Sequence, residues 1–140
     1  MGLTFHYSGR LKKEASLPDL IAEVKDISEI NGWTHHIFER HFQGADFGKE
    51  NFNNNLYGIS FNPTGSDPVW LCFLSNGRMS SPDLLQFYGS PDKISERKNL
   101  YLVSTKTQYA GMSTHRRVND LLRYLDNKYL ADFKAYDEGQ

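Results

Sequence analysis

The sequence predicts an α+β fold: a two-layer sandwich in which a mostly antiparallel sheet of five or six strands carries two helices on one face. The chain has 140 residues, the size of one domain, so we expect residues 1–140 to form a single domain. Two long segments show the hydrophobic period of helices, and several shorter segments alternate as strands do. Hairpin signals indicate antiparallel pairing, and two amphipathic helices suffice to cover only one face of such a sheet.

The first two elements are a strand and a helix. Apolar and polar residues alternate over residues 3–11, as in a half-buried strand. From Ser16 to Ile30 the apolar residues instead recur three or four positions apart, which predicts an amphipathic helix. Pro18 lies near its start, and Asn31-Gly32 supplies a typical helix end.

The middle of the chain predicts strands joined by turns. Residues 33–42 and 56–61 have strand character, and residues 44–55 between them form a loop rich in Gly, Asn and charged residues. Residues 69–74 are apolar at every position, so both faces of that strand must be covered. Asn76-Gly77 after it predicts a type I′ hairpin.

The second half adds a short helical turn, a strand, a long helix and a last strand. Residues 81–87 predict the turn, and residues 99–106 consist of good strand formers. After Gly111, an apolar stripe with helical spacing predicts the long helix, and residues 132–136 predict the last strand. The predicted order is therefore β-α-β-β-β-(β)-β-α-β.

The doubly apolar strand suggests the leading hypothesis for function. If its odd-numbered residues meet the two helices, then Trp70, Cys72 and Leu74 point to the other face. Long loops, a second subunit or a ligand must cover that face, because an open apolar patch promotes aggregation. We expect a non-catalytic binding or interaction module that forms a homo-oligomer, such as a homodimer, through these three residues.

A second candidate site lies at the corner where the strand ending at Lys106 leads into the long helix. A helix start offers free N–H groups and a positive dipole end, which favour a phosphate or carboxylate. The residues that could bind such an anion, including two accessory groups from the first strand, are Lys106, Gln108, Ser113, Thr114, His115, Arg116, Tyr7 and Arg10. An ordinary helix cap with solvated charges explains the same corner. The alternative hypothesis is thus a small enzyme or ligand-binding protein for a phosphorylated or carboxylated metabolite.

Catalytic and metal chemistry find little support. Glu39 and His41 could share an ion on a strand, but they need a third ligand from elsewhere, and His6 of the first strand is the one candidate. Surface histidines explain the pattern more simply, so we predict no metal and no cofactor. Cys72, the only cysteine, sits in an apolar strand and should be inert. The motifs of hydrolases, zinc proteases and dithiol enzymes are absent from the sequence. The catalytic residues are therefore unknown, and whether the chain is an enzyme stays open.

Charge and cysteine content limit the partners. Sixteen Lys and Arg against 17 Asp and Glu leave a net charge of −1, which disfavours nucleic acid and acidic membranes as partners. A lone cysteine, with neither a signal peptide nor a membrane-spanning stretch, predicts a cytoplasmic protein. The charge balance is compatible with a protein partner or a small anionic ligand.

Two stretches of the sequence resemble a family of small bacterial proteins of unknown function. The residues that carry this resemblance are Tyr7-Ser8-Gly9, the Pro18–Val24 segment, Thr107–Gly111, His115, Leu121–Leu125, Phe133 and Asp137–Gly139. The resemblance covers most of the chain and implies a bacterial cytoplasmic protein, with no activity to carry over.

Overall fold

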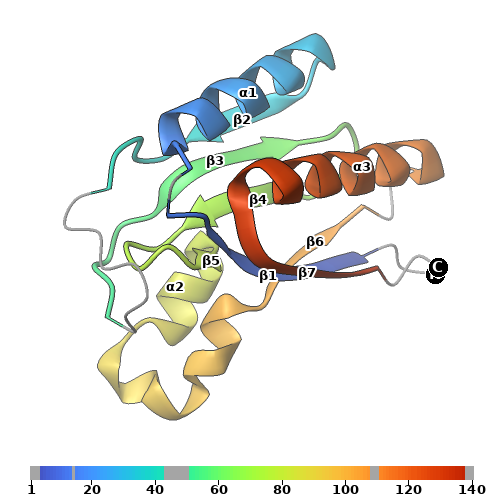
Figure 1. Cartoon of the computed structure of the whole chain (residues 1–140). Helices are drawn as coiled ribbons and strands as arrows, with labels where there is room; N and C mark the ends of the chain where they lie inside the picture. The colour runs from blue at the N-terminus through green and yellow to red at the C-terminus, as the bar shows by residue number, and fades with distance from the viewer. Residues whose placement is uncertain (1–3, 14, 43–50, 108–110, 138–140) are drawn as a thin grey trace.

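The computed structural model describes residues 4–13, 15–42, 51–107 and 111–137, and its fold is α+β as predicted (Figure 1). The strands are β1 (Thr4–Leu11), β2 (Thr34–Ile37), β3 (Tyr57–Asn62), β4 (Val69–Phe73), β5 (Met79–Ser80), β6 (Val103–Lys106) and β7 (Leu130–Asp137). The helices are α1 (Leu17–Ile30), α2 (Pro82–Tyr88), the 3₁₀ segment η1 (Pro91–Tyr101) and α3 (Gly111–Tyr129).

The strands form two antiparallel sheets instead of the single sheet predicted. One has the order β6-β1-β7 and the other β2-β3-β4-β5. They join where β1 passes the β4–β5 hairpin: Arg10 forms a bridge with Arg78, and the Leu11 N–H donates to the Gly77 carbonyl at 2.9 Å. The register of β1 against β7 shifts between Ser8 and Arg10, just before this junction.

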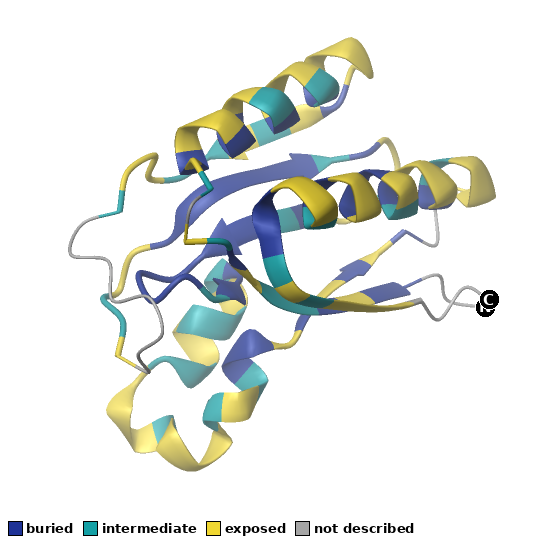
Figure 2. Ribbon diagram, viewed as in Figure 1, coloured by how far each residue is buried: buried dark blue, intermediate teal, exposed yellow. Residues whose placement is uncertain are grey.

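The elements form three layers, so the two-layer sandwich was wrong. Helices α1 and α3 lie together on one side of the strands, as expected for the two long helices (Figure 1). Segments α2 and η1 lie on the other side and form a third layer, whose outer surface is largely exposed (Figure 2). The sequence predicts α2 as a helical turn. The Gly and Pro residues after it indicate a break, and nothing in the sequence indicates that the next segment, η1, packs under the sheet.

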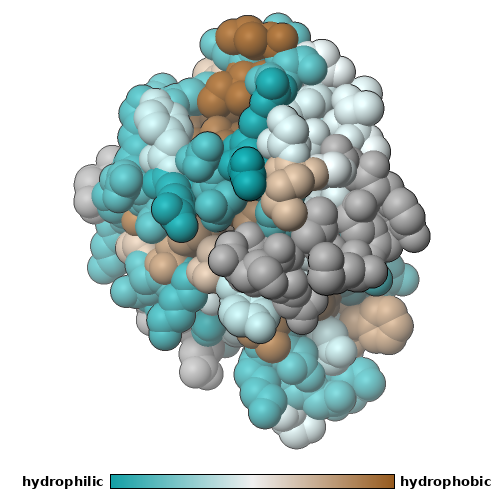
Figure 3. Space-filling view, turned by 90° about the vertical axis from the view of Figure 1, so that its right-hand side faces the viewer, coloured by the Kyte–Doolittle hydropathy of each residue, from teal (hydrophilic) through white to brown (hydrophobic). Residues whose placement is uncertain are grey.

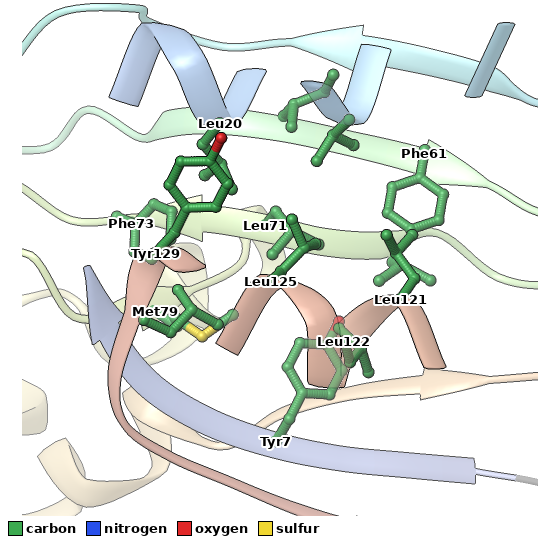
Figure 4. Packing of buried hydrophobic residues seen from close by; sticks show 14 of the residues in the cluster. Tyr7, Leu20, Phe61, Leu71, Phe73, Met79, Leu121, Leu122, Leu125 and Tyr129 are labelled. Carbon is green, nitrogen blue, oxygen red and sulfur yellow. The ribbon is translucent and has the colours of Figure 1, made fainter. Parts of the chain in front are cut away.

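The main core fills the space between the two long helices and the strands (Figure 4). Leu20 of α1 and Leu125 of α3 face Leu71 and Phe73 of β4 across this space. Side chains from both sheets belong to the same buried cluster. The alternation predicted for β4 is thus confirmed, because its odd-numbered residues meet the helices.

The helix boundaries agree with the sequence for α1 and differ for α3. Ser16 caps α1 by accepting the Asp19 N–H at 3.3 Å, with Pro18 in the first turn. Helix α3 instead begins at Gly111, whose φ of +86° suits a residue without a side chain. Ser113 and Thr114, which the sequence also offers as caps for this helix, therefore lie inside the first turn of α3.

Two further local predictions need correction. Of the strand predicted over 99–106, only 103–106 pair with β1, because 99–101 complete η1. The Asn76-Gly77 hairpin exists but is not type I′, a turn that requires positive φ at both central residues. Only Gly77 takes a positive φ, +87°.

Candidate anion-binding cleft

The residues of the predicted corner between β6 and α3 that the structure describes lie at different depths in the fold. The side chains of Lys106, Ser113 and Arg116 are exposed, Thr114 is half-buried, and Gln108 lies outside the described residues. His115 is only 3% exposed; it shares a hydrogen bond with the Thr107 hydroxyl and stacks on the Phe5 ring, 4.1 Å between centroids. His115 is therefore a core residue rather than a ligand at the surface.

Tyr7, an expected accessory group at that corner, links the two sheets from inside. Its hydroxyl oxygen accepts the Trp70 N–H at 2.9 Å and lies 2.9 Å from the Thr105 hydroxyl, which donates to the Pro68 carbonyl at 2.8 Å. Because the Thr105 hydroxyl donates its one proton to the Pro68 carbonyl, the Tyr7 hydroxyl must donate to the Thr105 oxygen. Burial raises the pKa of Tyr7 well above its usual value, so this donor stays protonated.

Arg10, the other accessory group, cannot reach the corner. Lys106 pairs with Thr4 at the opposite end of β1, six residues from Arg10, which is roughly 20 Å along a strand. The Arg10 Nε instead lies 3.3 Å from an Asp132 carboxylate oxygen, in an exposed ion pair.

The face around Trp70 is covered by the chain itself. Cys72 and Leu74 are fully buried in a second core cluster with Leu100 and Tyr101 of η1, and Trp70 is half-buried against it. The sequence analysis named loops, a second subunit or a ligand as the cover of this face. In the structure, the η1 segment of the same chain covers it. Cys72 and Leu74 are thus inaccessible to a second subunit, which removes the structural reason for placing an interface there. Self-association itself stays a prediction, which sedimentation would test.

A different feature, a cleft of about 850 Å³, lies between η1 and the junction of β1 with the β4–β5 hairpin. We call it the η1 cleft. Its lining residues are Ser8, Asn51, Phe52, Asn54, Arg78, Gly89, Pro91, Ile94, Arg97, Lys98, Tyr101 and Leu102. Two other clefts, of about 580 and 500 Å³, are smaller.

Three cationic side chains line the η1 cleft: Arg78, Arg97 and Lys98. No carboxylate of the described residues lies within ion-pair distance of any of them. The Arg78 guanidinium lies over the Tyr101 ring, 3.4 Å from its centroid, and Arg97 lies 5.2 Å from the centroid of Phe52. The lining is therefore positively charged in a chain whose net charge is −1.

Polar contacts position the backbone of Arg78 and the side chain of Arg97. Asn76, buried in the hairpin, accepts the Arg78 N–H at 3.0 Å and donates to the Tyr101 hydroxyl at 3.4 Å. Arg97 donates to the carbonyls of Tyr88 and Ser90 at 3.0 and 3.2 Å, which ties the end of α2 to η1. These bonds use two of the five guanidinium donors of Arg97 and leave the others for a ligand.

The loop before β3 supplies another part of the lining, which includes Asn51, Phe52 and Asn54. The Asn53 N–H donates to the Ser75 hydroxyl at 2.8 Å, and its side-chain amide donates to the Tyr57 hydroxyl at 2.8 Å. Asn53 thereby fixes Phe52 beneath Arg97. Residues 51–55 fall in the loop predicted over 44–55, but residues 44–50 of that loop lie outside the described residues.

The chemistry of the η1 cleft favours binding of an oxyanion. Stacking restrains a guanidinium so that its edge presents N–H donors in a fixed plane, which suits carboxylate and phosphate groups. The described lining contains no Asp, Glu, His or Cys. Elsewhere, no group of three or more such side chains in the described residues could hold a metal ion. Sequence reasoning missed this cleft because its cations come from distant segments that only the fold brings together.

Comparisons with protein-family models, curated proteins and solved structures each returned no match. Among the described residues, no helix is long and apolar enough to cross a membrane.

Proposed function

We propose that this chain binds a small organic anion, a carboxylate or a phosphate, in the η1 cleft. The observation that carries the proposal is the set of three cations, Arg78, Arg97 and Lys98, which line one cleft without a carboxylate partner among the described residues. Like charges gathered in a concave surface repel one another, and an anionic ligand relieves that repulsion. The chemical class agrees with the alternative hypothesis from the sequence, but the place differs.

The proposal is for binding rather than for a reaction. Acid–base catalysis near neutral pH most often uses an imidazole or a carboxylate, and the described lining contains neither. The described lining offers arginine, lysine, amide and hydroxyl groups. These groups hold and orient an anion well, since hydrogen bonds to a charged group are about twice as strong as neutral ones.

Titration calorimetry with inorganic phosphate and with acetate tests the proposal. Arg78→Ala should weaken binding by about tenfold, the loss of a charge-assisted bond of about 1.4 kcal/mol. Lys98→Ala should weaken it less, because Lys98 is exposed and solvent screens its charge. Arg123→Ala, which removes an exposed cation of α3 outside the cleft, is the matched control and should change nothing.

The predicted corner provides the competing location. If Lys106→Ala and Arg116→Ala abolish anion binding while Arg78→Ala leaves it intact, the ligand lies at the corner and the η1 cleft is the wrong site. Binding of neither probe by the wild-type protein would remove the proposal altogether.

A further inference from the structure

We infer that the ligand of the η1 cleft is an amphipathic anion, in which the phosphate or carboxylate group is attached to an apolar moiety. This inference rests on the proposed function and adds the class of ligand. It follows from the apolar side chains that flank the cationic ones along one wall of the cleft.

That wall is one side of η1. The residues of η1 and its C-cap that line the cleft beyond Pro91 are Ile94, Arg97, Lys98, Tyr101 and Leu102. The backbone of η1 is non-helical at Lys93 and Glu96, so the cleft itself, rather than a regular helical spacing, shows that these side chains share one side. The two cations occupy the middle of this stripe, and an aliphatic residue occupies each end. An anion held at the centre therefore has apolar surface within reach on either side.

The two aliphatic residues are conspicuously exposed. Ile94 is 68% exposed and Leu102 is 61% exposed, although the adjacent Leu100 is fully buried in the second core cluster. Single exposed aliphatic residues are ordinary on protein surfaces. Here, however, both line the same cleft as the cations and as the Tyr101 and Phe52 rings. Such a surface gains free energy when an apolar group covers it.

The rest of the surface supplies a comparison. The face shown in Figure 3 is mostly hydrophilic, and its hydrophobic residues gather in small groups, one of them at the top over the end of α1. Ile30, the last residue of α1, is 83% exposed and does not line the cleft. Ile30→Ser is therefore a control that removes the same exposed apolar side chain elsewhere.

The test compares phenyl phosphate with inorganic phosphate, and hexanoate with acetate, by titration calorimetry at one pH near neutrality. Within each pair the anionic group is shared and only the apolar moiety differs. We expect phenyl phosphate and hexanoate to bind about tenfold more tightly than their counterparts. Using both pairs also distinguishes a phosphate head from a carboxylate head.

The variants Ile94→Ser and Leu102→Ser should each weaken binding of the larger probe several-fold and leave inorganic phosphate or acetate unchanged. Ile30→Ser should affect no probe. Both cleft residues are exposed, so the variants should fold, which circular dichroism checks. Equal affinity for the two members of each pair would overturn this inference while leaving the proposed function in place. Failure of every anion to bind would instead overturn both.

Discussion

Replacing Tyr7 by Phe removes one oxygen atom that links the two sheets. That oxygen accepts the backbone N–H of Trp70 in β4 and donates to the Thr105 hydroxyl in β6, while the ring belongs to the main core (Figure 4). Phe keeps the ring and its packing. The substitution therefore isolates the two hydrogen bonds, and the Trp70 N–H loses the acceptor that pairs it.

The expected cost is about 1–3 kcal/mol, the penalty for leaving a largely buried donor without a partner. For a chain of this length, each kcal/mol lowers the melting temperature by roughly 3–5 °C. Tyr7→Phe should therefore melt roughly 3–15 °C below the wild type. Thr105→Val removes the next hydroxyl of the same chain, so the double variant should cost less than the sum of the two single variants.

Thermal and urea unfolding followed by circular dichroism measure these differences. Tyr136→Phe is the matched control, because Tyr136 lies on the neighbouring strand β7 and its side chain is 64% exposed. It should change stability by less than about 0.5 kcal/mol. Wild-type stability in Tyr7→Phe, or strict additivity with Thr105→Val, would refute the contribution of this hydrogen-bond chain to stability.

Three other predictions concern a carboxylate, a glycine and the cysteine. Burial tends to raise the pKa of Glu23, but hydrogen bonds from Lys128 and Tyr129 outweigh this effect and lower the pKa. The Glu23 carboxylate therefore stabilises the fold above its unfolded pKa, and this stabilisation is lost as the pH falls through its folded pKa. Glu23→Gln should therefore flatten the acid side of the stability profile, below roughly pH 5, and an unchanged slope there counts against the contact. Gly58→Ala places a Cβ 2.1 Å from the Leu71 carbonyl oxygen at a φ of +129°, and urea unfolding should show a loss of at least about 2 kcal/mol. Burial raises the pKa of Cys72, so a thiol reagent should label it only on unfolding, and rapid labelling of the native protein would contradict its burial.

Local sequence patterns determined the elements whose signals lie within a few residues. Ser16 and Pro18 start α1 by capping it, and the apolar stripe of α3 appears in the packing against β4 as predicted. The alternation in residues 69–74 also correctly placed Cys72 and Leu74 opposite the long helices. In each case the physical cause is local: a cap, a periodicity or the two-residue repeat of a strand.

The tertiary structure alone decided the third layer and the candidate site. Residues 91–101 carry kinks at Lys93 and Glu96 and a weak hydrophobic pattern, so their helical course depends on Leu100 and Tyr101 packing beneath β4. The division into two sheets depends on where β1 meets the hairpin at Arg78. The η1 cleft then combines Arg78 with cations about 20 residues later in the chain, which no local spacing in the sequence brings together. Long-range packing, rather than residue propensity, therefore places the charges on which the proposed function depends.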